Sequence, residues 1–172
     1  MACNLTGGIN TFNGCKDGVE SITSIYLTSA GNVVSPTYSG GTVSNFTGAT
    51  SGVYFEFKPR KNTSSFGSKA VVNAQNGTSY FDQSITLQFD KLDVAKRNVI
   101  QVLAQGTLNA IVKDGNSNYW MLGMINGLDL TESTFESGVA KGDFSGYKIV
   151  LNGKEASEMY AVASTLTTSL GI

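Results

Sequence analysis

An alternation of apolar and polar residues with a period of two is the clearest pattern in the chain. It is cleanest over residues 84–90, where Ile85, Leu87 and Phe89 alternate with Ser84, Thr86, Gln88 and Asp90. Successive side chains of a strand point to opposite faces of its sheet. The segment therefore predicts a strand with one buried face and one polar face.

Other segments favour strands as well. Residues 22–28 place Ile25 and Leu27 on one side, and residues 53–58 place Val53, Phe55 and Phe57 on one side, which predicts that these side chains face a core. Further strands are predicted over residues 108–113, 119–125, 128–131 and 146–152, with a weaker candidate at 159–163.

Residues 93–105 have a different period. Ala95, Val99, Val102 and Leu103 recur at helical spacing, and Asp90 or Asp93 can cap the start. A helix of this length is marginal alone in water, so we expect its apolar stripe to lie on a sheet.

Tight turns separate the predicted strands. Asn-Gly and Asp-Gly pairs, which suit the positive φ angles of hairpin turns, begin at Asn13, Asp17, Asn76, Asp114, Asn126 and Asn152. Residues 33–52 are rich in Gly, Ser, Thr and Asn, which favours an exposed loop or hairpin there.

These elements predict a mainly β protein, an antiparallel β-sandwich or barrel flanked by one helix over about 93–105. A chain of 172 residues suits one domain, 1–172, with an exposed loop or hairpin within about 33–69. The opening residues lack the apolar stretch of a secretory signal, and no apolar run is long enough to span a bilayer. We therefore expect no membrane partner and synthesis in a cytoplasm, where Cys3 and Cys15 are reduced packing residues.

Composition argues against catalysis. The chain has no histidine, which removes the commonest general base and metal ligand, and it has no phosphate-binding loop. We expect no enzyme activity, no cofactor and no metal. A pair of carboxylates among Asp129, Glu132 and Glu136 is formally able to hydrolyse glycosides, but a solvated acidic segment is the simpler interpretation.

The charges nearly cancel, to a net −1, but they are segregated along the sequence. Lys58, Arg60, Lys61 and Lys69 occur without an intervening acid, whereas residues 129–158 carry six acids and three lysines. A subunit with one basic and one acidic region can join copies of itself head to tail. Scattered surface charge is the alternative.

The second half of the chain resembles the tail tube proteins of tailed phages. The resemblance lies in Asn126–Thr131 and in Gly138–Glu155, and the opening Met1–Thr6 with Cys15–Val19 is similar to the start of phage structural proteins. The order of helix and hairpin agrees with that fold.

The resemblance implies a virion subunit that forms six-membered rings stacked into a tube that conducts DNA. Its partners would be its own copies, a tape measure protein and other tail proteins. A DNA conduit that bound phosphates would retain the genome, so DNA should pass without specific binding. We hypothesise that Ser84, Thr86, Gln88 and Asp90 face the lumen. We further hypothesise that Lys58, Arg60 and Lys61 contact Asp129, Glu132 and Glu136 of the next ring.

Two other functions fit the sequence. A capsid decoration or head-to-tail connector protein would share the β-rich composition and the lack of chemistry. A carbohydrate-binding β-sandwich would instead use aromatic residues as a sugar platform, with Trp120, Tyr119, Tyr26 and Tyr54 as candidates.

Overall fold

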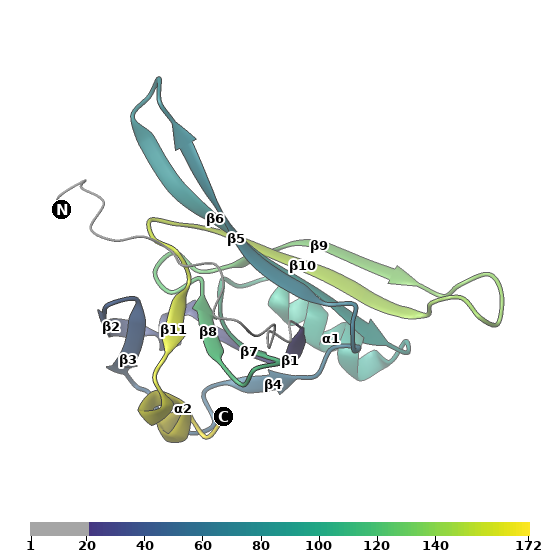
Figure 1. Ribbon diagram of the computed structural model, residues 1–172. Coiled ribbons are helices and arrows are strands. Elements are labelled where there is room, and N and C mark those ends of the chain that lie inside the picture. The colour runs from purple at the N-terminus through teal and green to yellow at the C-terminus, as the bar shows by residue number, and fades with distance from the viewer. Residues whose placement is uncertain (1–20) are drawn as a thin grey trace, which may run out of the picture.

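The structure, a computed structural model, describes residues 21–172 (Figure 1). Cys3, Cys15 and the turn pairs at Asn13 and Asp17 lie outside the described residues. The strands are β1 (Ile22–Ser29), β2 (Val34–Ser39), β3 (Thr42–Thr47), β4 (Phe55–Phe57), β5 (Ser65–Asn73), β6 (Thr78–Asp90), β7 (Leu108–Asp114), β8 (Tyr119–Leu122), β9 (Asp129–Glu136), β10 (Gly146–Glu155) and β11 (Tyr160–Val162). The helices are the short 3-10 helix η1 (Ala30–Asn32), α1 (Val94–Leu103) and α2 (Ser164–Leu170).

The strands form two open sheets. Sheet A has the order β2-β3-β11-β8-β7-β1-β4, and sheet B has the order β5-β6-β10-β9. Strands β3 and β11 pair in parallel, and the other neighbours are antiparallel. The predicted mainly β sandwich with a helix is confirmed, and neither sheet closes into a barrel.

Sheet A is buried on both of its faces. The inner core lies between the sheets, where Ile25 and Val112 of sheet A pack in one cluster with Ile85, Leu87 and Ile149 of sheet B. The outer core lies on the opposite face of sheet A and is covered by α2, which contributes Leu166 and Leu170. Ile25 and Leu27 share the predicted inner face, but the other face of residues 22–28 is buried as well, with Ser24, Tyr26 and Thr28 all at most 9% exposed.

Buried polar groups tie the two sheets together. Gln83 of β6 accepts a hydrogen bond from the amide of Gly123, which follows β8, at 2.9 Å. Glu155, at the end of β10, is 3% exposed, and its Oε1 accepts from the amides of Ile125, Asn126 and Gly127 at 3.0, 2.8 and 3.3 Å. Buried donors need such partners, so these contacts fix how sheet B lies on sheet A.

Helix α1 is present as predicted, and Asp93 caps it by accepting a hydrogen bond from the Ala95 amide at 3.3 Å. The predicted apolar stripe is wrong in part. Leu103 is buried, but Val99 and Val102 are 42% and 68% exposed. The helix lies at the margin of the sandwich, so only its Leu103 side, together with Ile100, reaches the inner core.

The predicted faces of residues 53–58 also need correction. Tyr54 is buried in the outer core, whereas Phe55 is 67% exposed. Phe55 belongs to β4, the edge strand of sheet A, and lies opposite Leu27 of β1. Phe57 reaches inward, with its ring 6.2 Å from that of Phe89.

Two further features differ from the predicted pattern. The Asn152-Gly153 pair lies inside β10 and makes no turn. Glycine is required at position 153 because the backbone of Gly127 approaches closely there: a Cβ at Gly153 would lie 2.3 Å from the Gly127 carbonyl oxygen. Residues 33–69 hold the β2–β3 hairpin, whose Val43 and Phe46 are buried, and the first residues of β5.

Candidate self-assembly surface

Sheet B presents a polar face on the side opposite the inner core. Residues directly opposite each other in antiparallel strands have side chains on the same face. The register aligns Thr86 of β6 with Val150 of β10 and Glu132 of β9, and it aligns Asp90 with Gly146 and Glu136. The four residues predicted to face a lumen, Ser84, Thr86, Gln88 and Asp90, therefore share this face with Glu132 and Glu136.

The free edges of the two sheets differ in how they are protected. The edges of sheet A are blunted, because β2 carries Pro36 and two register irregularities and β4 is only three residues long. Strand β5 of sheet B pairs with β6 without irregularity over nine residues, and Lys69 is its one charged residue. A long, regular edge with little charge is open to pairing with another chain.

The opposite edge of sheet B is acidic. Strand β9 is eight residues long and carries Asp129, Glu132 and Glu136, all exposed. Its register shifts between Val150 and Leu151 of β10, where Thr131 is the additional residue on β9. The strand therefore differs from β5 both in charge and in regularity.

The predicted basic residues lie at the β5 side of the sheet. They belong to the segment between β4 and β5, where the Arg60 amide donates to the carbonyl oxygen of Gln88 on β6 at 2.7 Å. The structure thus places the basic and the acidic residues at opposite edges of one sheet. They do not meet within a single chain.

Two of the predicted cations already have partners in their own chain. Arg60 forms an ion pair with Asp90 at 3.4 Å and lies 6.0 Å from the centre of the Phe144 ring. Lys58 pairs with Glu56, also at 3.4 Å. Within residues 21–172, Lys61 and Lys69 form neither an ion pair nor a hydrogen bond through their side chains, which leaves these two cations available to another molecule.

Strands β5 and β6 extend beyond the sandwich as a long hairpin (Figure 1). Its tip is ordered by Asn73, whose side-chain oxygen accepts from the amides of Gln75 and Asn76 at 3.0 and 3.2 Å. Gly77 has a φ of 63°, as expected for the predicted Asn76-Gly77 turn. Val72 near this tip is 73% exposed.

Residues 65–73 were not predicted as a strand. The sequence Ser-Phe-Gly-Ser-Lys-Ala-Val-Val-Asn has no sustained alternation, so periodicity alone gives no strand there. The Asn76-Gly77 pair shortly before the alternating residues 84–90 is the signal that could have found it, because a hairpin turn requires a partner strand on its other side.

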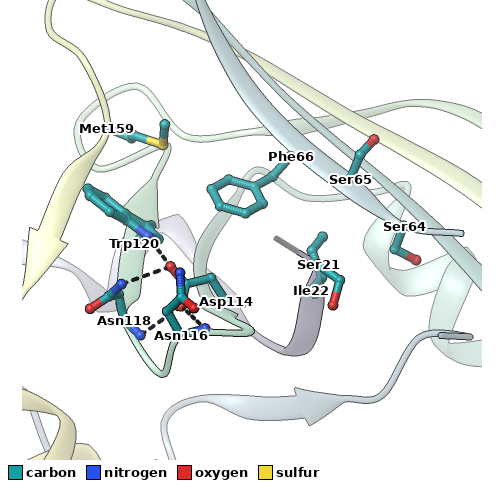
Figure 2. Close-up of a pocket in the computed structure, with 10 residues that line it drawn as sticks. All are labelled: Ser21, Ile22, Ser64, Ser65, Phe66, Asp114, Asn116, Asn118, Trp120 and Met159. Carbon is teal, nitrogen blue, oxygen red and sulfur yellow. Dashed lines mark hydrogen bonds between the residues drawn. The ribbon is translucent and has the colours of Figure 1, made fainter. Parts of the chain in front are cut away.

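A pocket between the sheets contains the single tryptophan (Figure 2). It has a volume of about 590 Å³, and Trp120, Phe66 and Met159 form its apolar side. The indole nitrogen of Trp120 donates to Asp114 at 3.1 Å, and Asn118 donates to the same carboxylate from its amide and its side chain at 2.8 and 3.1 Å.

These contacts make Asp114 the organiser of the β7–β8 turn. Burial raises the pKa of its carboxyl, but the hydrogen bonds from Trp120, Asn118 and Asn116 outweigh burial and hold the pKa below its ordinary value. These donors occupy both carboxylate oxygens, so the hydrogen bonds of Asp114 hold the β7–β8 turn in place.

The aromatic residues proposed as a sugar platform do not form one. Trp120 packs against the inner core, whereas Tyr26, Tyr54 and Tyr119 lie with the outer core on the other face of sheet A. Tyr26 and Tyr54 are 9% and 7% exposed. A platform requires exposed rings on a common face, so these four side chains cannot act together on a glycan.

The three carboxylates considered as a glycosidase pair are not arranged around a cleft. Asp129, Glu132 and Glu136 follow one another along a single exposed strand and do not face each other across a cleft. No group of three or more acidic, histidine or cysteine side chains in residues 21–172 is placed to hold a metal ion. Among the described helices, none is long and apolar enough to cross a membrane.

Comparisons with known proteins add one structural neighbour. No protein-family model matches the sequence, and no curated protein matches it. Among solved structures, a chain from the virion of a native gene transfer agent particle aligns with a TM-score of 0.36 and 11% identity, over 64% of this chain and 89% of that chain.

Proposed function

We propose that the protein is a structural subunit that joins copies of itself edge to edge through sheet B. One observation carries the proposal: the same small sheet has an unprotected edge flanked by basic residues on β5 and an acidic edge on β9. Pairing β5 of one copy with β9 of the next satisfies both backbone edges and brings opposite charges together. Repetition of such a head-to-tail contact yields a closed ring or an open filament.

The assembly that we propose is a phage tail tube built from stacked six-membered rings. The segments that resemble tail tube proteins, 126–131 and 138–155, belong largely to β9 and β10 and to the hairpin between them, and therefore to sheet B. Joined sheets would enclose a channel lined by the polar face, with Ser84, Thr86, Gln88 and Asp90. The sequence pattern predicted contacts between rings for the segregated charges, but their position on opposite edges favours a contact within a ring.

Charge reversal tests the edge contact. Lys61→Glu with Lys69→Glu makes the β5 side acidic, and Glu132→Lys with Glu136→Lys makes β9 basic; all four side chains are exposed, so the fold should be retained. We expect each double variant to remain monomeric in sedimentation velocity under conditions in which the wild-type protein assembles.

Combining the four substitutions restores opposite charges across the contact, so the quadruple variant should recover assembly. Glu158→Lys, an exposed change away from both edges, is the matched control and should assemble normally. Assembly of both double variants at wild-type concentrations would rule out the proposed pairing of β5 with β9.

A capsid decoration or connector protein could use the same edges, because the contact is independent of the particle it builds. The symmetry of the isolated assembly separates these functions. Stacked rings support a tail tube, whereas a single ring that never stacks supports a connector.

A further inference from the structure

Asn-Gly pairs are chemically labile, and the structure describes three of those in the sequence: Asn76-Gly77, Asn126-Gly127 and Asn152-Gly153. The glycine amide nitrogen, with no side chain to shield it, can attack the side-chain carbonyl of the preceding asparagine. The attack needs a glycine amide that is free of hydrogen bonds and a backbone that can rotate. The three pairs differ in both respects.

The Asn126-Gly127 pair is held at both reacting groups. The Asn126 side-chain amide donates a hydrogen bond to the carbonyl oxygen of Lys154 at 2.7 Å. The Gly127 amide belongs to a buried residue and donates to Oε1 of Glu155 at 3.3 Å. Attack by this amide would break both hydrogen bonds, so the folded protein protects the pair.

The Asn152-Gly153 pair is fixed by sheet B. Both residues belong to β10, which lies between β6 and β9, and they pair with Ser84 and Gln83 of β6. The Asn152 side chain donates to the hydroxyl oxygen of Thr131 at 3.2 Å. Rotation of this backbone requires an interior strand to open, so the pair is protected as well.

The Asn76-Gly77 pair has neither restraint. It lies in the turn between β5 and β6, at the tip of the hairpin that extends beyond the sandwich, and both residues are exposed (Figure 1). Within residues 21–172, neither the Asn76 side chain nor the Gly77 amide forms a hydrogen bond. Asn73 binds the amide of Asn76, which is not a reacting group. No atom lies within 4 Å of a Cβ built at Gly77, so water reaches the pair freely.

We propose that Asn76 is a site of spontaneous deamidation. The Gly77 nitrogen loses its proton to solvent base and forms a bond to Cγ of Asn76, and the side-chain nitrogen leaves as ammonia with a proton taken from water. The product is a cyclic imide. Water opens this ring at either carbonyl, which yields aspartate or isoaspartate. Water is consumed, ammonia is released, and nothing is oxidised or reduced.

The reaction changes the charge of the hairpin tip. The sequence has no charged residue between Lys69 and Asp82, so the product places one carboxylate on an otherwise uncharged turn. Both reacting groups belong to one copy of the chain. The inference is therefore independent of the proposed assembly, and a wild-type protein that stays monomeric would contradict the proposed function and leave the deamidation intact.

Peptide mapping of the full-length protein after incubation in mildly alkaline buffer tests the proposal. The three pairs fall in separate tryptic peptides, 70–91, 114–141 and 149–154, so mass spectrometry follows each of them. We expect peptide 70–91 to gain the mass difference between an amide and an acid at least about tenfold faster than the other two, because those must first open locally. We also expect isoaspartate at position 76. The control is the chain unfolded in urea, where all three pairs should react at similar rates.

Several outcomes would overturn the assignment. Asn126 or Asn152 reacting as fast as Asn76 in the folded protein would do so, as would an Asn76 that stays an amide while the unfolded chain reacts. Aspartate without isoaspartate would contradict the cyclic imide. Gly77→Ala, at an exposed position with space for the added Cβ, should slow the reaction, and an unchanged rate would contradict attack by the Gly77 nitrogen.

Discussion

At the scale of single residues, buried polar groups decide how the two sheets are held together. Glu155 is nearly inaccessible and its Oε1 accepts three backbone hydrogen bonds, whereas the hydroxyl of Tyr54 is buried and finds no hydrogen-bond partner within residues 21–172. The first arrangement stabilises the fold and the second costs stability, because an unpaired buried polar group loses its bonds to water.

Removal of the Glu155 carboxylate should therefore destabilise the protein. Glu155→Ala leaves three amides without an acceptor, and we expect a loss of about 2–4 kcal/mol in the free energy of unfolding, measured with urea. Glu155→Gln keeps an oxygen acceptor and should lose less. Glu158→Ala, at an exposed position, should stay within about 0.5 kcal/mol of the wild type. Equal stability of the two alanine variants would contradict the assigned role.

The buried hydroxyl of Tyr54 should make the protein less stable at alkaline pH. Burial raises the pKa of its hydroxyl above the ordinary 10.0. A group whose pKa is raised by folding contributes its full stabilisation below the unfolded pKa, and the protein loses that contribution as the pH rises through 10 toward the folded pKa.

Tyr54→Phe should remove this part of the alkaline loss and should not lower stability at pH 7. Urea unfolding at pH 7 and at about pH 10.5 measures both effects. A variant that loses stability at high pH as steeply as the wild type would show that Tyr54 does not carry the dependence.

At the scale of elements, periodicity predicted the strands whose two faces differ and failed where they do not. Strand β6 alternates cleanly over residues 84–90, which the pattern predicts as a strand, whereas its first six residues do not alternate and lie outside the predicted segment. The sequence does not predict β5 because neither of its faces is consistently apolar. It does not predict α2 because five of the seven residues are Ser or Thr and only Leu166 and Leu170 are apolar. The edge positions of β5 and β9 depend on strand order, which no local pattern contains.

Helix α1 shows the same limit within one element. The chain offers two apolar stripes, one through Val99 and Val102 and one through Ile100 and Leu103, and only tertiary packing chooses between them. Both stripes fit a helical period, so the sequence predicted the helix, with Asp90 or Asp93 as its cap, but not which side is buried.

Alanine substitutions test which stripe is buried. Leu103→Ala should cost about 2–4 kcal/mol in the free energy of unfolding, because it leaves a cavity in the inner core. Val102→Ala, at the preceding, exposed position, should change the free energy of unfolding by less than about 0.5 kcal/mol. Thermal or urea unfolding of the two variants compares them, and the reverse order would show that Val102 faces the core.

At the scale of the whole molecule, the proposed assembly would make the polar face of sheet B the wall of a channel. Lys148 already lies on this face, opposite Gln88, and further lysines there would attract more strongly the phosphates, which duplex DNA carries at about one charge per 1.7 Å. Thr86→Lys with Gln88→Lys should therefore leave the assembly intact and slow DNA ejection. The matched control is Thr37→Lys with Ser39→Lys on β2, which should eject normally. Normal ejection by the Thr86 and Gln88 variant would argue against a position in the lumen.

The central claim is that identical copies combine their small sheets into a closed conduit. Negative-stain electron microscopy of the purified protein at about 100 µM tests it most directly, because ring size and stacking are visible in single images. We predict six-membered rings with a central opening and short tubes of stacked rings. Isolated monomers throughout, at a concentration at which weak contacts between subunits would be saturated, would contradict the account.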